Sequence, residues 1–71
     1  MRLSPKEVKV LTLVAKGKTD KEVGVILELS ERTVQTYMTR ILQKLGAVNR
    51  VNAAVLFFVE HPELFKKKKQ K

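Results

Sequence analysis

Apolar residues recur along residues 31–45 at the spacing of one face of an α-helix. Four of them lie four, three and four positions apart, namely Val34, Met38, Ile41 and Leu45. The other positions include three threonines, which are mediocre helix formers. A helix that only needed to be soluble would more often carry Glu, Lys or Ala at such positions. The pattern predicts a helix with one buried side and one polar side that is available to contact something else.

Start and stop signals divide the rest of the chain into further helical segments, and no stretch has the pattern of a β-strand. Ser4 with Glu7 and Thr19 with Glu22 are capping boxes, in which a hydroxyl group and a glutamate three residues later bond N–H groups at a helix start. The residues expected to cap the helix starts are Ser4, Thr19, Ser30 and Asn49. The expected helix ends are Gly17, Glu28, Gly46 and His61-Pro62. The predicted helices span about residues 5–16, 20–27, 31–45 and 50–60.

The second and third of these helices have the spacing of a helix-turn-helix. A helix of about eight residues, a three-residue turn and a longer helix match that geometry, and Gly24 stands where a bulky side chain would push the two parts apart. We expect Val23, Ile26 and Leu27 on the apolar side of the second helix, with Leu29 plugging the turn. The predicted fold class is therefore all-α, a four-helix domain that contains a helix-turn-helix. A plain helical bundle is the alternative that the spacing leaves open.

Composition excludes several other classes of protein. With 71 residues and 44% hydrophobic content, the chain suits one small folded domain. It has no cysteine and a single histidine, His61, so thiolate metal sites are excluded and no cofactor is expected. The longest apolar run, residues 53–59, is far shorter than the roughly 20 residues of a membrane span. Since the N-terminus also lacks a signal peptide's apolar core, we expect a cytoplasmic protein that does not enter a membrane.

An enzyme is not expected, because the candidate nucleophiles have another role. Ser4 and Ser30 are explained as helix caps, and nothing in the sequence supplies a general base beside either of them. His61, the one histidine, stands beside a proline that ends a predicted helix. The polar residues therefore favour a binding role.

Positive charge dominates the chain but is unevenly distributed. The formal net charge is +8. Five lysines stand in the last six residues, KKKKQK, and contribute five of these positive charges. We expect residues 1–65 to form the domain and residues 66–71 to be a disordered, lysine-rich tail. Such a tail is usually only solvated, and the alternative is a non-specific attraction to a polyanion such as DNA.

Several short motifs together resemble the LuxR-type (FixJ, NarL and GerE) DNA-binding domain. They are Leu3-Ser4-Pro5-x-Glu7, Lys21-Glu22-Val23, Ser30-Glu31-x-Thr33-Val34 and Lys44-Leu45-Gly46, followed by Asn49-Arg50. The resemblance covers about residues 3–59 without a gap, and it implies a transcription regulator that binds duplex DNA through a helix-turn-helix. Because the length is similar to that of GerE, we expect a free-standing regulator without a receiver or ligand-binding domain.

The resemblance also implies which residues contact DNA. In that family the third helix reads bases in the major groove, and the start of the second helix faces the DNA backbone. With the two arginines of the polar side added, the residues expected to read bases are Arg32, Gln35, Thr36, Thr39 and Arg40. The residues expected to contact phosphates are Thr19, Lys21, Thr33, Tyr37 and Lys44.

The chain departs from the family pattern at a few positions. Gln35 stands where a basic residue is usual, which argues against a guanine contact there, and Tyr37 replaces a histidine. Val8-Lys9 stands in place of Arg-Glu, and Val25-Ile26 in place of polar residues. Val8 and Val25 therefore indicate either extra buried surface or an additional contact patch.

The fourth predicted helix is apolar nearly all round, so both of its sides should be buried. Ala53, Ala54 and Phe57 have the spacing to face the core of the domain. A second apolar line is formed by Val51, Val55 and Phe58. We expect this line to pair with a second copy of the chain, as the fourth helix does in the family. The alternative is that Leu64 and Phe65 fold back over it.

Two hypotheses for the function follow from these patterns. The first is sequence-specific binding of duplex DNA by a homodimer that regulates transcription. The second is a protein-interaction module of helix-turn-helix form, which pairs with a longer regulator or with RNA polymerase. Affinity for duplex DNA that falls steeply with salt would distinguish the first from the second.

Overall fold

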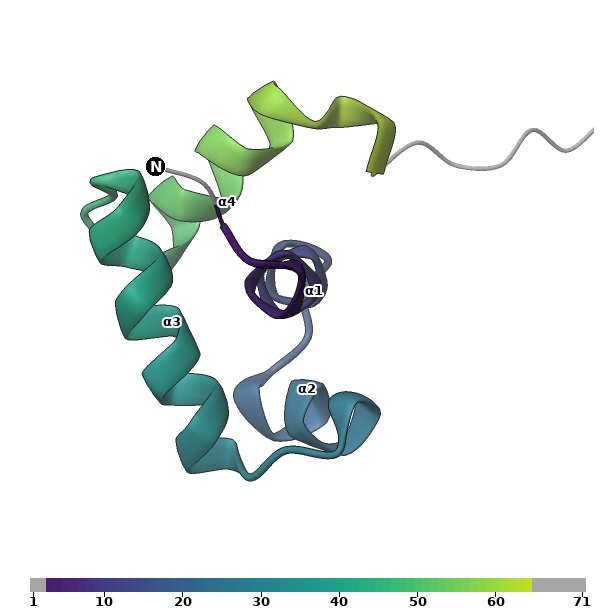
Figure 1. Ribbon diagram of the computed structural model, residues 1–71. Coiled ribbons are helices and arrows are strands. Elements are labelled where there is room, and N and C mark those ends of the chain that lie inside the picture. Colours follow the sequence, from purple (N-terminus) through teal and green to yellow (C-terminus); the bar gives the residue numbers. More distant parts are fainter. Residues whose placement is uncertain (1–2, 65–71) are drawn as a thin grey trace, which may run out of the picture.

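The computed structural model describes residues 3–64 of the chain, and all the regular elements within that part are helices (Figure 1). Its elements are α1 (Pro5–Ala15), α2 (Asp20–Leu27), α3 (Glu31–Leu45), α4 (Arg50–Glu60) and a short 3-10 helix, η1 (Pro62–Leu64). The all-α prediction is confirmed, and only the end of α1 differs from the predicted bounds, by one residue. Phe65 and the predicted tail, residues 66–71, lie outside the described residues.

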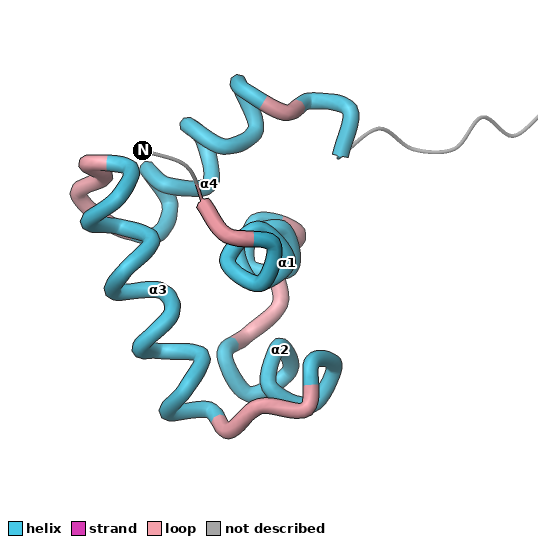
Figure 2. Tube along the Cα trace, viewed as in Figure 1, coloured by secondary structure: helices cyan, strands magenta, loops and turns pink. Residues whose placement is uncertain are grey.

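The helices surround α1, which Figure 1 shows end-on at the centre. α3 runs along one side of it, α2 lies below it and α4 above it, and α1 contacts all three. Figure 2 shows that short loops join consecutive helices. This arrangement leaves the side of α3 that faces away from α1 open along its length (Figure 1).

The core takes side chains from each of the four α-helices. The buried apolar residues are Val10, Leu11, Val23, Val34, Met38, Ile41, Ala53 and Phe57. Three of the four residues of the predicted stripe on α3 are therefore buried, and the fourth, Leu45, is half-buried and packs against them. Burial of this stripe fixes which side of α3 faces outward.

The helix starts are capped as the sequence predicts. Ser4 Oγ accepts a hydrogen bond from the Glu7 amide at 3.2 Å, and Glu7 Oε1 accepts one from the Ser4 amide at 2.8 Å. Thr19 and Glu22 make the same pair of bonds at 3.1 and 2.8 Å. Each box satisfies N–H groups that have no partner inside the helix, so both helices start at a defined residue. The predicted caps of the other two helices, Ser30 and Asn49, are also confirmed.

The turn of the helix-turn-helix depends on Gly24. A Cβ atom at this position would lie 2.5 Å from the carbonyl oxygen of Leu29, which is closer than real Cβ atoms come. The Leu29 amide in turn donates to the Gly24 carbonyl oxygen at 2.7 Å. Gly24 therefore lets the backbone of the turn lie directly against α2. Glu28 ends α2 in the left-handed conformation, with a φ of 61°.

The prediction that Ile26 belongs to the apolar, inward side of α2 is wrong. Ile26 is 51% exposed and Val25 is 74% exposed, whereas Val23 is fully buried. α2 is short and is covered on one side only, by α1 and α3. Val23 and Leu27, four residues apart, occupy that side, and Ile26 lies about 100° round the helix from Leu27, past the edge of the contact. Val8, the other departure that indicated extra buried surface or a contact patch, is half-buried against the core.

Candidate nucleic-acid interface

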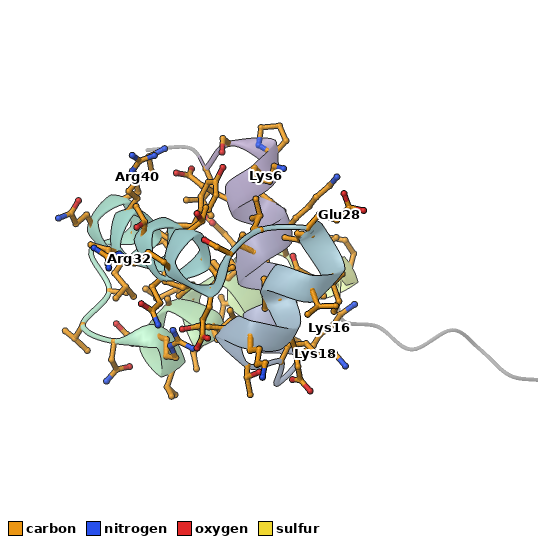
Figure 3. The ribbon with its side chains drawn as sticks, turned by 90° about the horizontal axis from the view of Figure 1, so that it is seen from below. Lys6, Lys16, Lys18, Glu28, Arg32 and Arg40 are labelled. Carbon is orange, nitrogen blue, oxygen red and sulfur yellow. The ribbon has the colours of Figure 1, made fainter. Side chains whose placement is uncertain are left out.

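The exposed face of α3 holds the five residues predicted to read bases. All five are exposed, and they follow one another along the side opposite the buried stripe: Arg32, Gln35, Thr36, Thr39 and Arg40. Figure 3, a view from below, shows Arg32 and Arg40 on the part of α3 that faces away from α2. Since a helix rises about 1.5 Å per residue, these side chains extend over roughly 12 Å of α3.

Two of the threonines on this face hold their hydroxyl groups in a fixed direction. Thr36 Oγ1 donates to the Arg32 carbonyl oxygen at 3.2 Å, and Thr39 Oγ1 donates to the Gln35 carbonyl oxygen at 3.1 Å. Because each hydroxyl proton is used within the helix, the oxygen is left to accept bonds from outside. Each threonine therefore offers an acceptor and a methyl group, which suit the amino groups of adenine and cytosine and the methyl group of thymine.

The residues predicted to contact phosphates are less uniform in exposure. Thr19 and Lys21 are exposed at the start of α2, where the helix dipole favours an anion. Thr33 and Tyr37 are half-buried on α3, at the margin of its exposed face. Thr33 Oγ1 accepts a hydrogen bond from Ser30 Oγ at 2.8 Å, so its acceptor capacity is partly used. Thr19 Oγ1 likewise accepts from the Glu22 amide.

Lys44, the fifth predicted phosphate contact, already has an acidic partner. Its Nζ lies 2.8 Å from Oε1 of Glu7, which is buried, so the pair ties the end of α3 to the start of α1. The bond from Lys44, together with the backbone bond from Ser4, holds the pKa of Glu7 below its ordinary value of 4.5. A phosphate contact at Lys44 would compete with this ion pair, and that contact stays a prediction.

A second ion pair that the sequence did not predict joins α4 to α2. Arg50 Nη2 lies 3.0 Å from Asp20 Oδ1 and 3.2 Å from Asp20 Oδ2. These residues are the first of α4 and the first of α2, and they stand 30 positions apart in the chain. Arg50 appeared in the sequence only as part of a family motif, and nothing local to it indicates an acidic partner.

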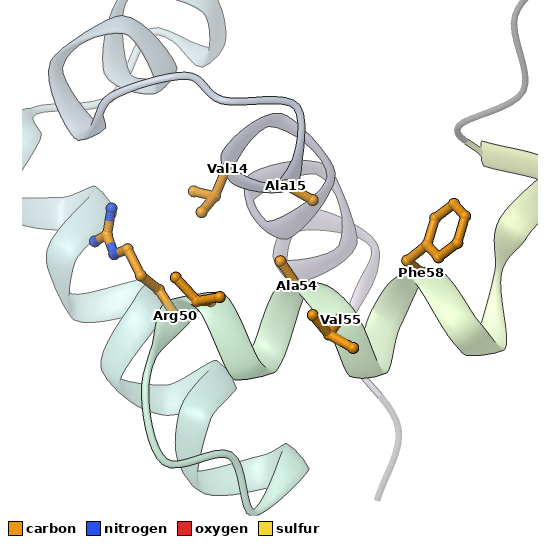
Figure 4. A pocket seen from close by; sticks show the side chains of 7 residues that line it. Val14, Ala15, Arg50, Ala54, Val55 and Phe58 are labelled. Atoms are coloured by element: carbon orange, nitrogen blue, oxygen red, sulfur yellow. The ribbon is translucent and has the colours of Figure 1, made fainter.

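The second apolar line of α4 lies on the surface of the described part of the chain. Val51 is 70% exposed, Val55 53% and Phe58 49%. They line a hollow of about 420 Å³ between α4 and the end of α1, which Figure 4 shows from close by. η1 contacts α4, but it leaves this line exposed. The dimer contact stays a prediction, and Phe65, named in the alternative, lies outside the described residues.

None of the helices in residues 3–64 is both long and apolar enough to cross a lipid bilayer.

Comparison with known proteins agrees with this geometry. Residues 1–57 match the family described as bacterial regulatory proteins, luxR family (GerE). The transcriptional regulatory protein LiaR of Bacillus subtilis (strain 168) is 42% identical over 59 residues, which cover 83% of this chain and 28% of LiaR. The transcriptional activator protein BjaR1 of Bradyrhizobium diazoefficiens is 40% identical over 55 residues, 78% of this chain and 23% of BjaR1.

A further relative comes from Porphyra purpurea. The probable transcriptional regulator ycf29 of Porphyra purpurea is 48% identical over 48 residues, which cover 68% of this chain and 23% of that protein. The chain thus spans about a quarter of the length of the curated relatives it matches. Because the family match covers residues 1–57, including the whole helix-turn-helix, the chain belongs to the LuxR family of bacterial regulatory proteins.

Proposed function

We propose that this chain binds duplex DNA in a sequence-specific manner, with α3 in the major groove, and thereby takes part in transcription regulation. The observation that carries the proposal is the exposed face of α3, where five polar side chains stand opposite an apolar stripe of which three residues are buried and one is half-buried. A major groove about 12 Å wide admits a helix of this kind. Such a function would belong to the cytoplasm of a bacterial cell, where the DNA is.

The chemistry of the side chains suggests how bases would be distinguished. Gln35 can donate to N7 and accept from the N6 amino group of adenine through one amide group. Thr36 and Thr39 can accept from amino groups or contact a thymine methyl group. Arg32 and Arg40 flank them with positive charge for guanine or for phosphates. Thr19 and Lys21 would hold the backbone beside the groove, because α2 packs against α3.

The proposed assembly is a two-fold dimer through α4. Val51, Val55 and Phe58 form an exposed apolar line that a second copy would cover. Such a dimer would place two α3 helices about one DNA turn, roughly 34 Å, apart on a partly palindromic site. Because the line is short, we expect pairing mainly on DNA.

The Val55→Asp variant tests the dimer. It should bind a duplex with two half-sites without cooperativity and retain its helix content, because a charge would enter an apolar contact. Val48→Asp is the matched control, since Val48 is also exposed but lies before α4. Undiminished cooperativity for Val55→Asp in a titration followed by native gel electrophoresis would rule out the α4 dimer.

A second candidate function is a protein-interaction module, favoured by the exposed side of α2. Val25 and Ile26 line a hollow of about 300 Å³ together with Lys18, Lys21 and Glu22. Apolar side chains this exposed are suited to a protein partner, such as a longer regulator or RNA polymerase. Under this hypothesis, a Val25→Ser/Ile26→Ser variant would lose a protein complex, and the wild type would not bind duplex DNA.

Binding of the chain to duplex DNA, measured by fluorescence anisotropy over a series of salt concentrations, tests the proposed function. We expect the logarithm of the binding constant to fall linearly with the logarithm of the salt concentration, with a slope of about −0.9 for each phosphate contact. A site selected from random duplexes should bind more tightly than an unselected duplex of the same length. Absence of any duplex binding at low salt would contradict the proposal.

A further inference from the structure

Arg50 reaches from α4 to the acidic residue at the start of α2. Its Nη2 atom contacts both carboxylate oxygens of Asp20, and the Asp20 side chain is only 14% exposed against 42% for Arg50. Figure 4 shows Arg50 extending from the first turn of α4, away from Val55 and Phe58. The ion pair therefore brings a positive charge from another helix to the first turn of α2.

The first turn of α2 carries a negative charge that would oppose its approach to DNA. Asp20 stands between Thr19 and Lys21, the two residues proposed to face a phosphate. A carboxylate at this position is favourable for the helix dipole but repels a phosphate. The cations of the segment itself, Lys18 and Lys21, only balance the charges of Asp20 and Glu22. Arg50 supplies the additional positive charge.

We propose that Arg50 is a positioning residue for DNA binding, which neutralises Asp20 so that the start of α2 can approach a phosphate. The inference rests on the proposed function, because it requires α2 to lie beside the DNA backbone. Arg50 acts on the phosphate through Asp20 and is not itself the phosphate ligand. The alternative is a structural role, in which the ion pair acts only as a mechanical tether between α4 and α2. The experiment must separate this role from the electrostatic one.

Three variants separate these roles, measured by DNA affinity at low salt. Arg50→Met keeps an unbranched apolar stem but removes the charge. It should weaken binding by about 3- to 10-fold, because the Asp20 carboxylate is then no longer neutralised near a phosphate. Asp20→Asn should bind at least as tightly as the wild type. The double variant has neither charge and should return to within about two-fold of the wild type. The loss in Arg50→Met should shrink as salt is raised, because salt screens the repulsion.

Controls exclude trivial causes of these changes. Lys16→Met removes one exposed positive charge from the end of α1, and it should cost less affinity than Arg50→Met. Arg50→Lys retains the charge and should bind within about two-fold of the wild type. If Arg50→Met does not fold, Asp20→Asn carries the test, because a tether predicts weaker binding for it and the electrostatic role does not. Circular dichroism shows whether each variant keeps its helix content.

Each outcome decides between the roles. A tether predicts that Asp20→Asn binds more weakly than the wild type and that the double variant is not rescued, and either result overturns the inference. A direct Arg50–phosphate bond predicts a double variant as weak as Arg50→Met, which overturns it as well. If the wild type binds DNA and Arg50→Met binds equally well, Arg50 has no such role. If the wild type binds no duplex at all, the proposed function itself fails.

Discussion

Glu7 shows how one side chain joins local and long-range structure. Its Oε1 atom accepts from the Ser4 amide and from Lys44 Nζ, at 2.8 Å in each case. The first bond sets the start of α1, and the second holds the end of α3 against it. Both stabilise the ionised carboxylate, which lowers the pKa of Glu7 below 4.5 although its burial opposes this.

We expect Glu7→Gln to lower the free energy of unfolding by about 1–2 kcal/mol at pH 7, because an amide cannot form the charged bond to Lys44. Since the folded-state pKa of Glu7 is lowered, its contribution is complete above pH 4.5 and is lost as the pH falls through the folded-state value. Urea unfolding of the two proteins should therefore differ at pH 7 and converge in acid. Glu22→Gln, which alters a capping box without an ion pair, is the control and should lose less stability. A difference that does not depend on pH would contradict this account.

The residue scale also shows what sequence can reveal. The capping boxes at Ser4 and Thr19 were predictable, because each depends on residues three positions apart. The pairs Glu7–Lys44 and Asp20–Arg50 join residues 37 and 30 positions apart. Their partners depend on how the helices pack, so no local pattern identified them. The exposure of the five residues predicted to read bases was predictable, because the buried stripe of α3 determines which side of the helix lies opposite it.

At the scale of the elements, the close contact between α2 and the turn makes Gly24 necessary. Gly24→Ala should lower the free energy of unfolding by about 1–3 kcal/mol, because the added Cβ would meet a backbone oxygen that has no rotamer to relieve the clash. Val25→Ala, on the exposed side of the same helix, is the control and should change stability by less than about 0.5 kcal/mol. Equal stability of the two variants in urea would show that the turn can move away freely.

The end of α2 carries a conformational cost that a substitution can remove. Glu28 holds a φ of 61°, a conformation that disfavours residues with a Cβ. Glu28→Gly should raise the free energy of unfolding by about 0.5–1 kcal/mol after the greater freedom of glycine in the unfolded chain is allowed for. Glu28→Ala removes the charge but keeps the Cβ, so it should not share the gain. Comparison of thermal midpoints would decide, and a loss of stability in Glu28→Gly would show that its side chain stabilises the turn.

The elements also show where periodicity stops being informative. In α3, which has four turns, the apolar stripe identified the buried side correctly. In α2, which has about two turns, the same reasoning placed Ile26 inside, although it is exposed. A short helix with apolar residues on two sides does not determine which side is covered, because that depends on the neighbours. The same ambiguity applies to α4, whose second apolar line is exposed in the single chain.

At the scale of the whole molecule, two surfaces follow from one packing arrangement. α1 lies at the centre and holds α3 on one side and α4 on another, so burial of the core leaves the polar face of α3 and the second apolar line of α4 exposed. The polar surface of α3 is proposed to read DNA, and the apolar line of α4 to pair two copies. Arg50, the first residue of α4, is proposed to neutralise Asp20 at the start of α2, so that α2 can approach a phosphate beside the α3 surface.

α3 is proposed to read bases through its exposed face. Selection of binding sites from random duplex DNA with the wild type and with Gln35→Ala, followed by affinity measurements on the selected sites, would show whether it does. We expect Gln35→Ala to keep its helix content, to lose about 1–3 kcal/mol of specific binding and to relax the preference at one base position of each half-site. Selection of the same site by both proteins, with equal affinity, would contradict the claim that Gln35 on α3 reads a base.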